Sequence, residues 1–279
     1  MHPILIAALL ATAVARIPGA AARAGASALP TMAVEDTMHT EVSEVLVKAP
    51  RVTLDEILNR VARGEARRDS ALHDMAFTIT VRVLSGVRDK GKPLEPLSET
   101  VTRVYKKKPD KLRTVKLREW HKNPKSKDDM NVEFRSRMDE EIVNFAFRPE
   151  ARRDFRYHIV GRELLGSHLI YRIAFEPRST LDPTIPSGIV WVETNDFVIL
   201  RQEVRFERSP VPLFLKGVDR MVIERQRVGD TWVLNRVLMR ATTSFKIPKF
   251  GDTFDFGLLF ADYAVNTGLD DSLFVASKR

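Results

Sequence analysis

A single change in the spacing of apolar residues constrains the fold of this chain more than any other feature. From Leu54 to Val61 the apolar residues recur at helical spacing, and from Met75 onward they alternate with polar residues at a period of two. A period of two is typical of strands, because successive side chains point to opposite faces. Strand-like segments then follow one another to residue 261, with Pro, Gly, Asn and Asp in the gaps between them.

Several of these segments are apolar on one face only, which is typical of an antiparallel sheet with one buried and one hydrated face. We therefore predict a mainly β protein with a single large curved antiparallel sheet, an unclosed half-barrel of about 11–12 strands. The predicted strands are 75–84, 100–107, 112–120, 132–138, 141–147, 155–164, 168–176, 188–193, 197–206, 218–228, 231–245 and 252–261.

One N-terminal helix is predicted before the sheet. Thr53 has the position of an N-cap, and Glu56 three residues later completes a capping box. An apolar stripe at helical spacing follows and ends at Gly64; it consists of Leu54, Ile57, Leu58 and Val61. Because one amphipathic helix cannot bury its own stripe, we expect this helix to cover the concave face of the sheet.

The clearest hairpin lies at residues 185–207. Two apolar runs, 189–192 and 197–200, flank the polar turn 193–196. The second run continues as an alternating strand, with Val198, Leu200, Val204 and Phe206 on one face and Arg201, Glu203 and Arg205 on the other. A strand pair of this kind covers either an ordinary core or a cavity for an apolar ligand.

The N-terminal residues have the pattern of a secretory signal. Residues 4–14 are apolar but too few to span a bilayer as a helix, and small-residue triplets follow within 24–28. We expect a signal peptide at 1–28, a flexible arm at 29–52 and one domain at 53–279. An uncleaved anchor is the alternative for the first segment. A cleaved signal predicts a periplasmic protein, secreted across the inner membrane.

The chain carries a formal net charge of +8. This excess is interpreted either as a contribution to solubility or as affinity for an anionic surface such as a membrane leaflet. The run Lys106–Lys108 has two similar interpretations: a charged strand edge that prevents aggregation, or a contact to phosphate or a lipid headgroup. No nucleic-acid-binding motif is present, so we expect no nucleic-acid partner.

The residue types needed for several chemistries are missing. The chain has no cysteine, which excludes disulfides, thiol catalysis and thiolate metal sites. It has no phosphate-binding Gly-Lys-Ser/Thr loop, no Gly-x-Ser-x-Gly elbow and no helical His-Glu-x-x-His. His158 and His168 fall on neighbouring predicted strands, but a zinc site needs a third ligand. We predict a protein that is not an enzyme and uses no metal and no cofactor.

Three features of the chain resemble the LolA-like periplasmic lipoprotein carriers, within the superfamily of outer membrane lipoprotein-sorting proteins. The first is the order of signal peptide, capped helix and strand 75–84. The second is the segment Val104–Arg113, similar to that family's strand, Lys/Arg-Pro turn and next strand. The third is Gly188–Glu207, similar to its late hairpin.

The resemblance implies an unclosed half-barrel whose apolar cavity shelters the acyl chains of lipids or lipidated proteins, without catalysis. The same fold also occurs in periplasmic sensors of envelope-stress signalling that bind an anti-sigma factor, so an interaction module is the alternative function. A solidly packed structural protein of the envelope is a third. We expect lipid or lipoprotein acyl chains as the partner, an envelope membrane protein as a second one, and a monomer.

The predicted lining is aliphatic and aromatic, and each of its residues has core packing as its alternative role. The segment 209–217 joins two strands yet is apolar, so it is either a loop folded over the core, a lid at the mouth of the cavity or a partner-docking loop. The lining residues are Leu58, Val61, Phe77, Ile79, Leu169, Tyr171, Ile173, Phe175, Trp191, Val198, Leu200, Phe214 and Leu215.

Overall fold

The computed structural model describes residues 52–87, 93–122, 143–166, 168–179, 185–208, 215–247 and 251–275. These residues form one long helix, α2 (Leu54–Ala71), ten strands and two short 3-10 turns, η3 (Arg152–Asp154) and η4 (Asp271–Phe274). The strands are β1 (Asp74–Gly86), β2 (Glu95–Lys107), β3 (Lys111–His121), β4 (Phe155–Leu165), β5 (His168–Pro177), β6 (Ser187–Glu193), β7 (Val198–Arg205), β8 (Leu215–Val228), β9 (Thr231–Ile247) and β10 (Gly251–Val265).

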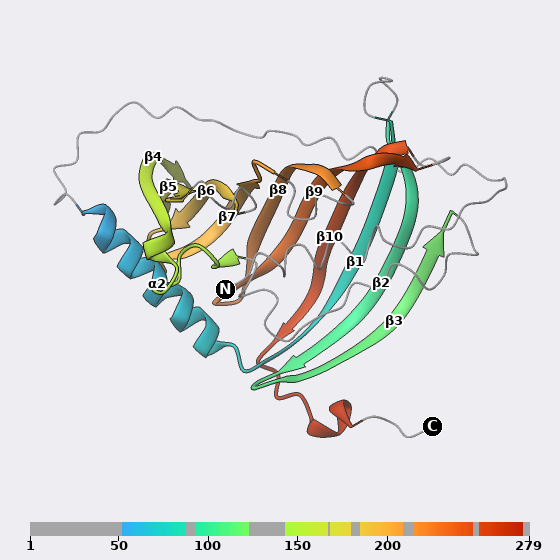
Figure 1. The fold of residues 1–279 in the computed structure, drawn as a ribbon. Helices are drawn as coiled ribbons and strands as arrows, with labels where there is room; N and C mark the ends of the chain where they lie inside the picture. The colour runs from blue at the N-terminus through green and yellow to red at the C-terminus, as the bar shows by residue number, and fades with distance from the viewer. Residues whose placement is uncertain are drawn as a thin grey trace.

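All ten strands belong to one antiparallel sheet in the order β3-β2-β1-β10-β9-β8-β7-β6-β5-β4 (Figure 1). The sheet is not closed, because β3 and β4 lie at its two edges. The first strand pairs with the last, so that Ile79 lies opposite Phe260 and Val83 opposite Phe256. The prediction of a mainly β protein with an open, curved antiparallel sheet and one helix is confirmed.

Two of the predicted strands are not among these ten. Residues 132–138 lie outside the described residues. The prediction for 141–147 was wrong over its described part, because Val143 is helical and the chain then turns, with Phe147 N–H donating to Asn144 O at 3.1 Å. The apolar residues Val143, Ala146 and Phe147 follow the spacing of one helical turn and are at most 1 % exposed. That spacing, rather than alternation, buries this segment against the sheet.

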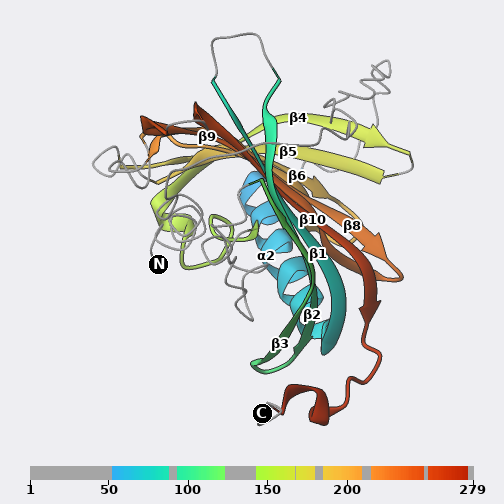
Figure 2. The same cartoon turned by 90° about the vertical axis from the view of Figure 1, so that its right-hand side faces the viewer.

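Helix α2 runs across the concave face of the sheet, over strands β4, β7 and β9 (Figures 1 and 2). Its N-terminus is capped as predicted, since Glu56 N–H donates to Thr53 Oγ1 at 3.2 Å. The helix does not end with its apolar stripe at Gly64 but continues to Ala71. It can do so because Glu65 and Arg68 on its inner face are buried and pair with charges there.

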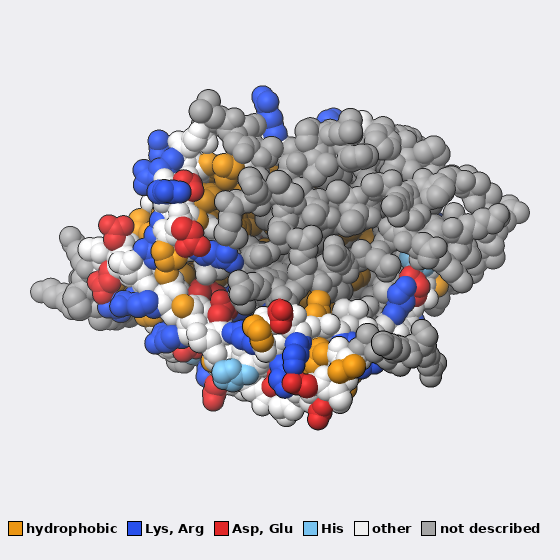
Figure 3. Space-filling model, turned by 60° about the horizontal axis from the view of Figure 1, so that its bottom comes forward, with side chains coloured by type: hydrophobic (Ala, Val, Ile, Leu, Met, Phe, Trp, Pro, Cys, Tyr) orange, Lys and Arg blue, Asp and Glu red, His pale blue; other side chains and the backbone are white. Residues whose placement is uncertain are grey.

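The register places apolar and charged residues on opposite faces of the sheet. Val237, Met239 and Leu258 continue the concave face, whereas the convex face carries ion pairs between neighbouring strands. These pairs are Arg82 with Glu99, Arg201 with Glu203 and Glu224, and Arg240 with Asp255. Side chains of both charges stand beside one another on the described part of the face shown in Figure 3.

A β-bulge changes the alternation expected for the hairpin of β6 and β7. Trp191 lies opposite Arg201, but the next pair is Val192 with Ile199, so Leu200 has no direct partner on β6. Ile199 therefore joins the core, completely buried, while Leu200 is partly exposed. The single-face alternation predicted from Val198 through Leu200 is thus broken, because a bulge inserts one residue and reverses the faces behind it.

Candidate functional site

The concave face of the sheet is the candidate site, and α2 covers one part of it. Ile57 and Val61 of the helix and Ile173 of the sheet are completely buried, and Ile223 of the sheet is 1 % exposed. These side chains belong to one continuous apolar cluster. Side chains therefore fill the space between α2 and the sheet. An apolar ligand could enter this space only if the helix moved.

The structure brings most of the predicted lining residues into this cluster. Those buried within it are Leu58, Val61, Phe77, Ile79, Tyr171, Ile173 and Phe175, and Leu169 packs at its margin. Val198 is buried outside the cluster. Trp191 lies on the convex face instead, with the Arg201 guanidinium 5.2 Å from its ring centre. Phe214 and the side chain of Leu215 lie outside the described residues.

An aromatic group packs around Phe175 at the β4–β5 end of the concave face. The ring centres of Phe145, Phe147 and Phe155 lie 5.6–5.8 Å from that of Phe175, in edge-on arrangements that favour aromatic contact. Tyr157 completes the group: its hydroxyl donates to the backbone oxygen of Ala146. Burial raises the pKa of Tyr157 to about 12. The hydroxyl therefore stays protonated and anchors the 143–147 turn to β4.

The apolar face also continues beyond α2, toward the other end of the strands. Phe254 and Phe256 on β10 are 2 % and 7 % exposed, and their rings lie 6.3 Å apart. Their partners on the same face are Val83 of β1 and Ala241 of β9. None of these four residues was among the predicted lining residues. The alternation within 252–261 would have placed the two phenylalanines on the apolar face.

A buried ion pair fixes the inner face of α2 to the sheet. Glu65 Oε1 lies 2.6 Å from Arg225 Nη1 and accepts the backbone N–H of Ile199 at 2.8 Å. Arg68 lies 3.7 Å from the second carboxylate oxygen and donates to Trp232 O at 3.1 Å. Burial by itself would raise the pKa of Glu65, but Arg225 and Arg68 outweigh it, so the pKa lies below its ordinary value. No sequence signal distinguishes these charges from solvated ones.

One polar side chain of the concave face is buried without a partner. Gln202 on β7 is 0 % exposed, and neither its side-chain oxygen nor its nitrogen has a hydrogen-bond partner within the described part of the chain. It lies opposite Val190 and Ile223, which are both in the core. A buried amide without a partner costs free energy, so this position is a weak point of the packing under α2.

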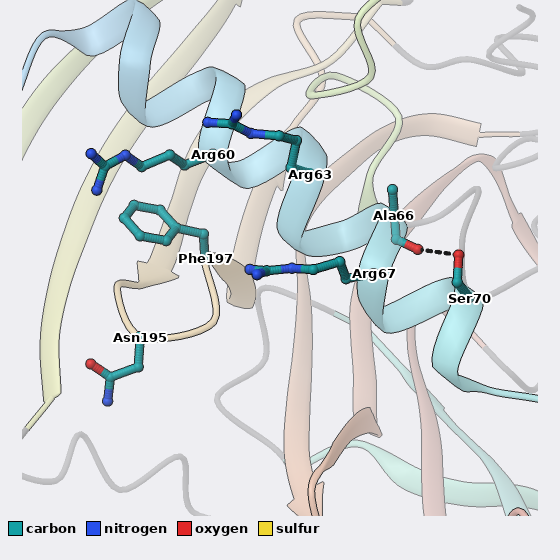
Figure 4. A pocket seen from close by; sticks show the side chains of 7 residues that line it. All are labelled: Arg60, Arg63, Ala66, Arg67, Ser70, Asn195 and Phe197. Atoms are coloured by element: carbon teal, nitrogen blue, oxygen red, sulfur yellow. Dashed lines mark hydrogen bonds between the residues drawn. The ribbon is translucent and has the colours of Figure 1, made fainter.

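The outer side of α2 borders a second hollow, which we call the arginine pocket (Figure 4). It has a volume of about 740 Å³ and lies between the helix and the turn that joins β6 to β7. Its lining residues are Arg60, Arg63, Ala66, Arg67, Ser70, Asn195 and Phe197. Gly64 allows the helix to approach this turn, because an added Cβ would lie 2.3 Å from Phe197 O.

Other features limit what the site can do. Within the described ranges, no group of three or more His, Asp or Glu side chains could hold a metal ion. His168 contacts Glu193 at 2.9 Å, and His158 lies on β4 opposite Ala174. Among the helical residues that the structure describes, no stretch is long and apolar enough to cross a membrane.

Comparisons with known proteins identify similar structures but no related sequences. No protein-family model matches the chain, and no curated protein does. A domain of an outer membrane lipoprotein-sorting protein from Vibrio parahaemolyticus is similar, with 14% identity and a TM-score of 0.43 over 78% of this chain and 95% of that one.

Two further structures are similar over comparable shares of the chains. A DUF1329 family protein from Desulfovibrio piger has 12% identity and a TM-score of 0.37 over 78% of this chain and 96% of its own. A LolA superfamily protein from Nitrosomonas europaea has 12% identity and a TM-score of 0.32 over 80% and 97%. The proteins from Vibrio parahaemolyticus and Nitrosomonas europaea belong to the groups that the sequence resembles.

Proposed function

We propose that this protein is a periplasmic carrier or binder of lipid or lipidated protein, which shelters acyl chains against the concave face of its sheet without catalysing a reaction. One observation carries the proposal: the apolar concave face is longer than the helix that covers it. Helix α2 lies over β4, β7 and β9 (Figure 1), whereas the buried side chains of Val83, Phe254 and Phe256 extend the same face on β1 and β10.

The physical basis is the burial of methylene groups. Each acyl methylene removed from water contributes about 0.8 kcal/mol, so a chain of many methylenes needs an extended apolar surface rather than a small pocket. A concave sheet offers such a surface, and a covering helix can be displaced from it. Gln202 lies on the face that α2 covers, and its amide has no hydrogen-bond partner among the described residues, which weakens the packing of that face. The buried pair of Glu65 with Arg225 holds the helix only while both charges are present.

Photolabelling tests the proposal on the unaltered protein. A palmitic acid carrying a diazirine is incubated with the protein, activated by light and located by peptide mass spectrometry. Labels are expected on alternate residues of β1 and β10 that share the concave face, such as Val83 and Phe256. Their neighbours Leu84 and Asp255 face the other way and provide the internal control. Labels on the convex face, or none, would contradict the proposal.

Native mass spectrometry after gentle purification separates the proposed carrier from the alternative sensor. Lipid that co-purifies with the protein supports the carrier. A lipid-free protein that captures an inner-membrane protein supports an interaction module instead. A lipid-free protein without such a partner supports a structural role.

A further inference from the structure

We propose that the arginine pocket binds the phosphate group of an anionic phospholipid and thereby docks the protein on a membrane surface. Arg60, Arg63 and Arg67 project from the outer side of α2, and Arg60 and Arg67 reach the β6–β7 turn (Figure 4). This side of the helix faces away from the apolar cluster, so the proposal does not depend on how the concave face is used.

The three arginines concentrate positive charge at one place. Their spacing of three and four residues makes them neighbours on the helix surface, where like charges repel one another. No carboxylate is among the described lining residues. Of the three arginines, Arg60 pairs with Glu56 outside this lining, whereas Arg118 and Arg240 on the sheet each stand beside an acid in an ion pair.

The guanidinium groups differ in what they already contact. Arg60 pairs with Glu56 and lies 5.2 Å from the ring centre of Phe197, and Arg67 donates to Asp196 O at 3.2 Å. Arg63 is exposed and forms no hydrogen bond or ion pair within the described part of the chain. Two arginines are thus held in place by their partners while the third is available, an arrangement suited to clamping an anion.

Phosphate is the anion that fits this chemistry. A guanidinium presents its N–H donors as a planar fork that matches phosphate oxygens, and it keeps its charge at any relevant pH. The ring of Phe197 and the methyl group of Ala66 add an apolar wall beside the charges. A phospholipid presents this combination, because its phosphate lies next to the glycerol and the first methylenes of its chains.

An acidic peptide fits less well. Arginine clusters also recognise acidic peptide motifs, but an extended peptide usually gains affinity from backbone hydrogen bonds to an exposed strand, and the described lining comes from a helix and a turn. The hydroxyl of Ser70 already donates to Ala66 O at 2.8 Å, and the amide of Asn195 contacts His168. The groups left for a ligand are therefore cations and an apolar wall.

Vesicle co-sedimentation tests the proposal. The protein is mixed with vesicles of phosphatidylcholine and phosphatidylglycerol at 3:1, or of phosphatidylcholine alone. The variant R60Q/R63Q/R67Q is expected to lose at least tenfold in affinity for the anionic vesicles, given the contribution of each basic residue near such a surface. Unaltered protein should bind the neutral vesicles weakly.

The matched control is R118Q/R205Q/R208Q, which removes the same charge from β3 and from the end of β7 remote from the pocket. This control should retain binding within about twofold. Should the triple pocket variant fail to fold by circular dichroism, the single change Arg63→Gln replaces it. Because Arg63 is exposed and forms no hydrogen bond or ion pair with the described residues, a loss of two- to fivefold is then expected without a change in stability.

Three results would overturn the proposal. Equal losses in both triple variants would mean that vesicles respond to diffuse charge. Calorimetric binding of inorganic phosphate without vesicle binding would mean a site for free phosphate. Binding of poly-glutamate that R60Q/R63Q/R67Q abolishes, again without vesicle binding, would mean an acidic peptide. Photolabelling of the concave face by an acyl chain is a separate experiment. Failure of the carrier proposal and failure of the arginine-pocket proposal can therefore be told apart.

Discussion

The carboxylate of Glu65 lies 2.6 Å from the guanidinium of Arg225, and each side chain is only 1 % exposed. The pair joins the middle of α2 to strand β8 across 160 residues of sequence. Taking two charges out of water is costly, so the pair is stable only while both members are present. It therefore sets how tightly the helix is held on the sheet.

Replacing Glu65 by Gln should destabilise the protein by about 3–5 kcal/mol, because Arg225 would remain buried without its counter-charge. Urea unfolding followed by circular dichroism measures the change. The double variant E65Q/R225M should be more stable than E65Q, since it removes the orphaned charge. As a control, E56Q breaks the exposed pair with Arg60 and should cost no more than about 1 kcal/mol.

The same pair predicts a dependence of stability on acidity. The pKa of Glu65 in the folded protein lies below its ordinary value of 4.5. A carboxylate with a lowered pKa stabilises the fold above its unfolded pKa, and this contribution is lost as the pH falls through the folded pKa. Stability measured by urea unfolding should therefore decrease below about pH 4.5, and less steeply in E65Q. Identical slopes in the two proteins would contradict this assignment.

Replacing Gly64 by Ala should destabilise the protein although alanine is the better helix former. The new Cβ would lie 2.3 Å from Phe197 O and 2.4 Å from Asp196 O, so α2 would have to move away from the turn. Forced overpacking of this kind costs about 1–3 kcal/mol. The control is Gly217→Ala on β8, where an added Cβ meets nothing within 4 Å and little change is expected. Thermal unfolding of both variants gives the comparison.

Replacing Phe175 by Ala should remove about 3–5 kcal/mol of unfolding free energy, because its ring is buried and contacts three other aromatic rings. Urea unfolding followed by far-ultraviolet circular dichroism is the measurement. Trp120→Ala removes a larger ring that is 47% exposed, and it should cost much less. Equal costs would mean that the aromatic group around Phe175 is not a packed unit.

Replacing Gln202 by Met should stabilise the protein by about 1 kcal/mol or more. Methionine has a similar volume and removes a buried amide that lacks partners among the described residues. An increase in the melting temperature would support this account. A decrease would show instead that the amide contributes a polar contact, and acyl labelling of Q202M would then reveal whether that contact serves the ligand.

The sequence predicted the helix and most strands because their signals are local. Thr53 and Glu56 form the predicted cap, and the alternation of Phe77, Ile79 and Val83 does place these side chains on one face. The chain around Val143 is an example in which the local pattern predicted the wrong structure. Its apolar residues also fit an alternating pattern, yet they follow one helical turn when packed on β4 and β5.

The candidate site was predicted less completely than the fold. The apolar stripe of α2 led to Leu58 and Val61, and alternation led to Tyr171 and Ile173. Trp191 was assigned to the wrong face, because neighbouring residues in a strand can be told apart only if the register is known. Glu65 was not proposed at all, since a charged residue in a helix ordinarily faces water.

By itself, the sequence determined that one capped helix precedes a long series of strands with one apolar face, and hence that the sheet must be curved and covered. Those properties depend on the direction of successive Cβ atoms, which is decided within a few residues. Only the tertiary structure decided that β1 pairs with β10, that a bulge turns Ile199 into the core, and that Glu65 meets Arg225. These depend on which distant segments come together, and local spacing carries no information about that.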